Sequence, residues 1–191
     1  MKRQTHLFTL KRRGLRLMAM TALATTLSTP LLANDSDKGV IFDKPPSAAA
    51  LADILFPSSG RSIVIGGSAT EAAPEGPKLF GLLINFEFGT ATIVQESLPF
   101  LDSVGQMLNL DSVRSESIVI EGHTDAVGES HFNDTLSQDR ALAVKDYLVS
   151  VHNVDKARLH PVGKGEVELF DANNPTAAVN RRVQFRPLDN N

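Results

Sequence analysis

The chain has 191 residues, enough for one ordinary domain with extensions, and it contains no cysteine. Without cysteine it can form neither disulfides nor thiolate zinc sites, and it has no cysteine nucleophile. Six of its 19 basic residues and none of its 22 acidic residues lie in the first 33 positions, so the remaining residues carry a net charge of −9. This acidic character argues against nucleic acid as a partner, because phosphate binding needs clustered lysine and arginine.

The N-terminal region has the pattern of an export signal. Basic residues up to Arg16 precede an apolar segment at residues 17–27, and Ala33 precedes a polar stretch. A basic region, a short apolar region and a small residue in this order are typical of a signal peptide. We therefore expect residues 1–33 to be a signal peptide that is cleaved after Ala33. The alternative is an uncleaved membrane helix over residues 15–32, near the lower limit of the roughly 17–25 residues that span a bilayer.

Residues 34–77 are expected to form a separate N-terminal arm and linker. Prolines at positions 45 and 46 favour extended backbone, and Ser47 suits the N-cap of a short helix over residues 48–55. Residues 66–77 are rich in glycine, alanine, serine and proline, as linkers are. The arm is either a spacer or packing arm, or a docking segment. The docking alternative would use four apolar residues: Leu51, Ile54, Leu55 and Phe56.

From residue 78 onward the apolar pattern alternates between strands and helices. It predicts four strands, at residues 79–86, 117–121, 157–162 and 179–186. It predicts two helices, at residues 93–110 and from 134 or 135 to 152, with loops at 124–132 and 164–178. The order βαβαββ predicts an α/β fold over residues 78–188, a two-layer sandwich with the helices packed on one mixed sheet.

The most informative residues are an acid in the predicted loop at residues 124–132 and a base in the helix that follows it. Asp125 follows an apolar strand, while Asn133, Ser137, Arg140 and Val144 share one stripe of the next helix at offsets of four, seven and eleven. A neighbouring carboxylate and guanidinium can bind the ammonium and the carboxylate of a zwitterion. The alternative is an ordinary ion pair between Asp125 and Arg140 that closes the loop. The spacing alone leaves both open.

Four motifs around these residues occur in the order found in one known family. They are Gly122-His123-Thr124-Asp125, Asn133-x-x-Leu136-Ser137-x-x-Arg140-Ala141, Gly163-x-Gly165-Glu166 and Asn180-Arg181-Arg182-Val183. Over residues 79–187 the sequence resembles the OmpA-like C-terminal domain, which binds peptidoglycan. The resemblance implies the same α/β sandwich and a non-catalytic cell-wall-binding protein of the periplasm. Such a protein would tether the wall to the outer membrane or to an envelope complex, with no cofactor.

The resemblance also implies roles for individual residues. In the family, the acid and base that match Asp125 and Arg140 bind the diaminopimelate of the peptidoglycan stem peptide. We therefore expect Asp125 to take the ammonium, Arg140 to take the carboxylate and Asn133 to add a hydrogen bond. Three further residues are expected in the same peptidoglycan-binding set: Thr124, Leu136 and Ser137.

The two arginines of the last motif are also candidates for this set. One of Arg181 and Arg182 is expected to approach the pocket or the glycan. The alternative is that they are solvated strand residues, or that they form internal salt bridges to an acid such as Glu121 or Glu166. The sequence does not say which of the two arginines approaches the pocket.

Other functions have weaker support in the sequence. His123 and His131 with Asp125 lack a recognised metal-ligand spacing, so no metal site is expected. A cell-wall hydrolase would need a nucleophile elbow, zinc-ligand spacing or a paired set of carboxylates, and none is recognisable. A membrane-anchored stator or scaffold protein is the alternative if residues 15–32 stay as a helix. Outer-membrane or envelope proteins are possible partners of residues 34–77.

Overall fold

The computed structural model describes residues 39–57 and 78–188. The expected signal peptide at residues 1–33 and the expected linker at residues 66–77 lie outside these ranges. Within the described ranges, no helix combines the length and the apolar character that a bilayer crossing requires.

The described residues form one mixed five-stranded sheet. Its strands are β1 (Val40–Phe42), β2 (Phe80–Leu82), β3 (Ile118–Gly122), β4 (Leu159–Gly163) and β5 (Val183–Pro187). The spatial order is β1-β2-β5-β3-β4. The outer pairs β1–β2 and β3–β4 are parallel, whereas β5 runs antiparallel to both of its neighbours. From β2 onward the chain follows the order βαβαββ, which confirms the predicted fold class.

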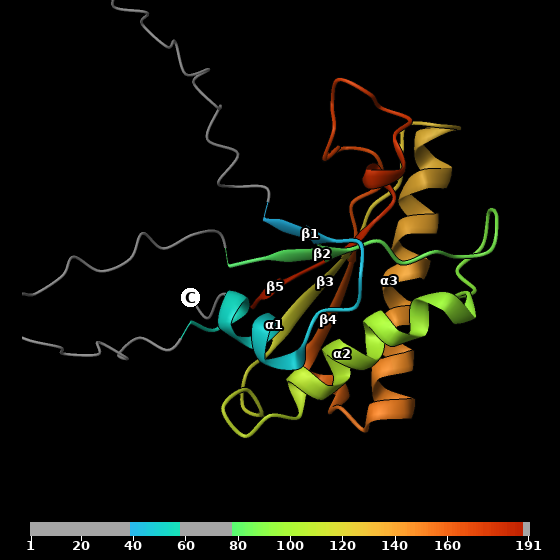
Figure 1. The fold of residues 1–191 in the computed structure, drawn as a ribbon. Helices are drawn as coiled ribbons and strands as arrows, with labels where there is room; N and C mark the ends of the chain where they lie inside the picture. Colours follow the sequence, from blue (N-terminus) through green and yellow to red (C-terminus); the bar gives the residue numbers. More distant parts are fainter. Residues whose placement is uncertain (1–38, 58–77, 189–191) are drawn as a thin grey trace, which may run out of the picture. The chain divides into compact units, whose positions relative to one another are not determined.

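Three helices cover one face of this sheet (Figure 1). They are α1 (Ala48–Leu55), α2 (Leu98–Leu108) and α3 (Ser130–His152). Phe80 of β2 and Ile120 of β3 both pair with Phe185 of β5, so these three side chains lie on the same face. All three are fully buried, and the rings of Phe80 and Phe185 stack with centroids 5.1 Å apart. The apolar core therefore lies between this face and the helices.

The N-terminal arm belongs to the same core. The Ser47 hydroxyl accepts a bond of 3.2 Å from the amide of Ala50, so serine caps α1 as predicted. Leu51 and Leu55 are 0% and 1% exposed and pack in the core beneath α1. The arm is thus a packing arm in this region. A docking role for Leu51 and Leu55 is contradicted, because their side chains are already buried within the chain.

The first predicted strand and helix are both shorter in the structure. β2 ends at Leu82, because the amide of Asn85 donates to the Ser97 hydroxyl and Phe86 forms an isolated antiparallel bridge with Ile93. Residues 83–86, the predicted end of the strand, therefore lie outside β2, and residues 86–93 form a loop. α2 begins at Leu98 after a 3₁₀ turn at Gln95–Ser97.

The second helix is longer than predicted, and the last strand is shorter. α3 begins at Ser130, because Gly128 takes a φ of 100° that turns the loop into the helix early. It ends as predicted at His152. The predicted loop at residues 124–132 is shortened accordingly. β5 begins only at Val183, because residues 178–180 form a 3₁₀ turn. Arg181 and Arg182 therefore precede the strand instead of alternating within it.

Candidate functional site

Two paired glycines let the N-terminal half of α3 lie close to the sheet. Gly122 and Gly163 are partners in the parallel pairing of β3 and β4. A Cβ on Gly122 would lie 2.1 Å from the carbonyl oxygen of Ser137, and one on Gly163 would lie 2.7 Å from the Ser137 hydroxyl. Side chains larger than hydrogen do not fit here. The two glycines therefore allow the C-terminal ends of β3 and β4 to pack closely against α3, the helix that carries Arg140.

The loop that carries Asp125 is fixed by hydrogen bonds from α3. The Asn133 side-chain amide donates to the main-chain oxygens of Asp125 and Val127, at 3.4 and 3.1 Å, and to Glu166 Oε2 at 2.6 Å. The Ser137 hydroxyl accepts from the amide of Gly165 at 2.9 Å. Asn133 and Ser137 are 3% and 0% exposed. Both residues therefore position the loops on either side of the site.

The carboxylate of Asp125 is paired with Arg181. Arg181 Nη1 lies 2.7 Å from Asp125 Oδ2, and Asp125 Oδ1 accepts from the amide of Val127 at 3.2 Å. The Asp125 side chain is 13% exposed, whereas that of Arg181 is 47% exposed. In residues 39–57 and 78–188 no ion pair joins Asp125 to Arg140. The ion pair between Asp125 and Arg140 that the sequence suggested is thus replaced by one between Asp125 and Arg181. The 3₁₀ turn before β5 brings Arg181 to the loop.

Arg140 is a buried arginine, and only some of its hydrogen-bond donors have partners among the described residues. It is 9% exposed, its Nε donates to the carbonyl oxygen of Thr90 at 3.1 Å, and its Cζ lies 4.8 Å from the ring centroid of Phe86. Its two Nη atoms have no hydrogen-bond or ion-pair partner among the residues that the structure describes. Burial lowers the pKa of Arg140, nearby Arg181 lowers this pKa further, and Asp125 raises it. The three charged groups therefore act on one another.

The second arginine of the last motif is bound inside the fold. Arg182 is 5% exposed; its Nε donates to Gln184 Oε1 and its Nη2 to the carbonyl oxygen of Glu168, both at 3.2 Å. Burial lowers its pKa to about 10, while the charges of Glu168 and Glu121 act to raise it. Arg181 is therefore the arginine of this motif that reaches the loop of Asp125.

The remaining candidates differ in how they meet the site. The Thr124 amide donates to the carbonyl oxygen of Gly165 at 2.9 Å, but its buried hydroxyl has no partner within the described ranges. Leu136 is half-buried on α3, between Asn133 and Arg140 in sequence. The Thr124 side chain is therefore buried, whereas that of Leu136 is partly accessible.

His123 lies in the interior. It is 2% exposed, and neither ring nitrogen is hydrogen-bonded within the described part of the chain. His131, by contrast, is exposed on α3. No cluster of three or more metal-ligating side chains occurs among the residues that the structure describes.

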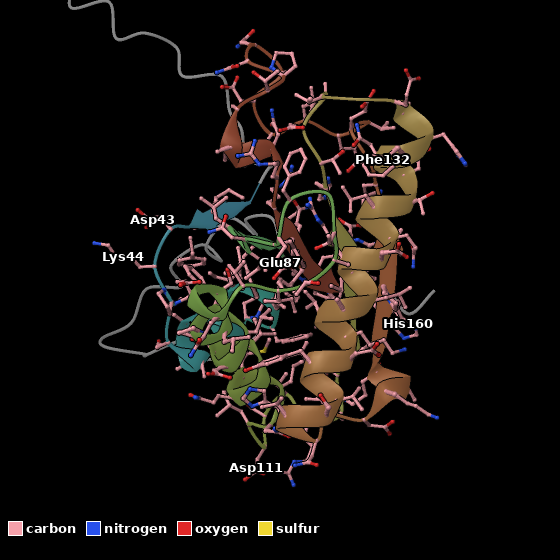
Figure 2. The ribbon with its side chains drawn as sticks, turned by 90° about the vertical axis from the view of Figure 1, so that its right-hand side faces the viewer. Asp43, Lys44, Glu87, Asp111, Phe132 and His160 are labelled. Atoms are coloured by element: carbon pink, nitrogen blue, oxygen red, sulfur yellow. The ribbon has the colours of Figure 1, made fainter. Side chains whose placement is uncertain are left out.

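The sequence did not identify the loop at residues 86–90 as part of the site. Its backbone binds Arg140 through Thr90, and its Phe86 lies under the same guanidinium. In Figure 2 this loop, labelled by Glu87, lies on one side of α3, and His160 of β4 lies on the other side. The predicted strand ended at Phe86 and residues 87–92 were assigned to no element, so only the tertiary fold brings this loop to the helix. Gly89 is the signal of a turn that the sequence offers there.

Comparison with known proteins agrees with this architecture. A model of the OmpA family matches residues 85–182, about half of the chain. The chain belongs to the OmpA family. The matched region contains the loop at residues 86–90, Asp125, Arg140 and both arginines of the last motif, so the whole candidate site lies within it.

Two curated relatives and one solved structure illustrate the similarity. Outer membrane porin F of Pseudomonas aeruginosa is 31% identical over 131 residues, which cover 67% of this chain and 36% of the porin. Outer membrane protein A of Bordetella avium is 38% identical over 103 residues, covering 52% of this chain and 51% of that protein. The peptidoglycan-associated lipoprotein of Burkholderia pseudomallei is 26% identical with a TM-score of 0.47, covering 56% of this chain and 89% of that one. The chain thus spans a third to a half of the length of the two curated relatives.

Proposed function

We propose that this OmpA-family chain is a non-catalytic peptidoglycan-binding protein of the bacterial envelope. Its site would bind the diaminopimelate of the stem peptide through Asp125 and Arg140. The observation that carries the proposal is the buried Arg140, whose two Nη atoms have no partner in the described part of the chain, close enough to Asp125 for their charges to interact. A buried guanidinium normally has an anionic partner, and a ligand carboxylate would supply one.

The chemistry of diaminopimelate fits this arrangement. Its free end carries an ammonium and a carboxylate on the same carbon. The carboxylate would accept two parallel hydrogen bonds from the Nη atoms of Arg140, a geometry that lysine cannot provide. The ammonium would bind the carboxylate of Asp125. Both protein groups are largely shielded from water, which strengthens charge-assisted hydrogen bonds.

Arg181 would exchange partners when the ligand binds. It holds Asp125 at 2.7 Å in this structure, so the incoming ammonium takes over the position of its guanidinium. Its half-exposed side chain is free to turn toward the ligand carboxylate, beside Arg140. Asn133 and Ser137 would keep the loops in place, and Thr124 and Leu136 would line the pocket. In this proposal Arg182 stays buried in the fold and supports the site indirectly.

The location and the wider role follow from the same proposal. Relatives of this chain are described as an outer membrane porin and an outer membrane protein, and a similar structure as a peptidoglycan-associated lipoprotein. We therefore place the chain in the periplasm, bound to the cell wall. It would link the wall to the outer membrane or to an envelope complex, through residues of the 34–77 region other than the buried Leu51 and Leu55.

A pair of peptides that differ by one carboxylate tests the proposal. Calorimetry would measure binding of the chain to a stem peptide ending in diaminopimelate and to the same peptide with lysine at that position. Lysine lacks the carboxylate that Arg140 would bind. We expect the lysine peptide to bind at least about 30-fold more weakly, since losing a buried charged contact costs about 2–5 kcal/mol.

Protein variants complete this experiment. Asp125→Asn and Arg140→Gln should each lose at least about 30-fold in affinity for the diaminopimelate peptide. Glu129→Gln is the matched control, because Glu129 is an exposed acid four residues after Asp125 whose side chain does not cap α3. Equal affinity for the two peptides would refute the assignment of the carboxylate to Arg140. Unchanged binding by both folded variants would refute the site.

A further inference from the structure

Phe88 is a fully exposed aromatic side chain next to the proposed site. Its relative exposure is 103%, the largest among the exposed apolar residues that the structure describes. Single exposed apolar side chains are common on protein surfaces, so exposure alone implies nothing. What distinguishes Phe88 is its position at the tip of the loop that holds Arg140.

This loop is held in one conformation by its own hydrogen bonds. The amide of Glu87 donates to the carbonyl oxygen of Thr92 at 2.9 Å. The amide of Thr90 donates to the carbonyl oxygen of Glu87 at 3.1 Å. The Thr90 hydroxyl accepts from the amide of Thr92 at 3.1 Å. Gly89 has a φ of 68°, as the third residue of a type II turn requires. Phe88 therefore lies on an ordered turn, so little backbone entropy is lost when a ligand binds to its ring.

The same loop is joined directly to Arg140. Thr90, two residues after Phe88, accepts the Nε bond of Arg140, and Phe86, two residues before it, lies under the guanidinium. Consecutive Cα atoms are about 3.8 Å apart, so the Cα of Phe88 lies within about 8 Å of the Cα atoms of both residues. A ligand part that extends a few residues from Arg140 can thus reach the Phe88 ring.

We propose that Phe88 is a sugar-binding platform that stacks on a pyranose ring of the glycan strand while the stem peptide occupies the site. This inference rests on the proposed function. The stem peptide joins the glycan within three residues of diaminopimelate, a reach of about 10 Å in extended chain. A pyranose ring presents a face of C–H groups, which the electron-rich face of an aromatic ring attracts.

The charges of the loop favour a neutral ligand part over an anionic one. Between residues 85 and 92, Glu87 is the one charged residue. Because it is acidic, the tip of the loop has no group for a phosphate and repels carboxylates. An uncharged carbohydrate ring suits a surface that combines an aromatic face with polar threonine and asparagine neighbours. The glycan strand has this chemistry, whereas an anionic lipid surface would need lysine or arginine here.

The test compares two ligands that share the stem peptide. Calorimetry would measure binding of the full chain to the diaminopimelate peptide alone and to the same peptide attached to its disaccharide. For the wild type we expect the disaccharide to improve affinity by about 3- to 10-fold. Phe88→Ala should lose this gain and keep its affinity for the peptide alone, while Phe88→Trp should keep the gain. Val151→Ala, which removes a 52% exposed apolar side chain from the last turn of α3, should change neither value.

The outcomes separate the two proposals. If Phe88→Ala keeps the full gain from the disaccharide, or if the wild type shows no gain, the sugar platform is refuted while peptide binding stands. If the wild type binds neither ligand, the proposed function fails and the platform fails with it. If Phe88→Ala loses affinity for the peptide alone as well, Phe88 contacts the peptide and the assignment to the sugar is overturned.

Discussion

The buried imidazole of His123 should make the fold sensitive to mild acid. Burial, helped by the positive charges of Arg182 and Lys164, lowers the pKa of His123 from 6.5 to about 3. In the unfolded chain the pKa returns to about 6.5. Between these two values the unfolded chain binds a proton that the folded chain does not, so the free energy of unfolding falls as the pH falls from about 6.5 to about 3.

The size of this effect follows from the same two pKa values. Each pH unit within the window is worth about 1.4 kcal/mol, so His123 alone should cost about 2 kcal/mol at pH 5 relative to neutral pH. This is a large share of the stability of a typical domain, which is about 5–15 kcal/mol. His123→Phe removes the titrating group. Neither ring nitrogen makes a hydrogen bond of good geometry within the described ranges, although the backbone of Glu168 is close enough to act to raise the pKa of His123.

Urea unfolding of the wild type and of His123→Phe at pH 7 and pH 5 measures this difference. The wild type should lose about 2 kcal/mol more than the variant between the two pH values. Equal losses in the two proteins would refute the reasoning. A His123 ring that titrates near pH 6.5 in the folded protein, seen by nuclear magnetic resonance, would refute it independently.

Two further predictions concern packing and a hydrogen-bonded tyrosine hydroxyl. Gly122→Ala should destabilise the fold by about 3 kcal/mol, because its Cβ would meet the backbone of α3, whereas Gly89→Ala should cost only about 1 kcal/mol for its positive φ in open space. Equal costs in chemical denaturation would contradict the close approach of α3 to β3. Tyr147 is the only tyrosine of the chain; burial, together with its 2.8 Å hydrogen bond to Asp102, raises its pKa to about 12. Ultraviolet absorbance should therefore show one tyrosinate transition near pH 12 that Asp102→Asn moves toward 10, while a wild-type midpoint near 10 would contradict the contact.

The local patterns in the sequence were sufficient for the fold from β2 onward. Helix-spaced apolar residues located α2 and α3, and the order of the elements predicted a mixed sheet with helices on one face. They did not predict that β1 pairs with β2 or that α1 shares the core, because long-range pairing leaves no periodic signal in a three-residue strand. The early start of α3 depends on the positive φ of Gly128, which the sequence permits but does not require.

The internal contacts of the candidate site were only partly predictable. Motif spacing predicted that Asp125 and Arg140 lie near each other, and Asp125 acts to raise the pKa of Arg140. It did not predict that Arg181 pairs with Asp125, because that contact depends on a 3₁₀ turn in place of a longer strand. Nor did it predict the loop of Thr90, whose contact with Arg140 joins residues 50 positions apart.

Co-sedimentation with purified diaminopimelate-type sacculi tests the central claim most directly. The wild-type chain and Glu129→Ala should pellet with the sacculi. Asp125→Ala and Arg140→Ala, each verified as folded by circular dichroism, should remain in the supernatant, since each loses a charged contact worth about 2–5 kcal/mol. A wild-type chain that stays in the supernatant would contradict cell-wall binding. Pelleting of both folded variants would contradict the site.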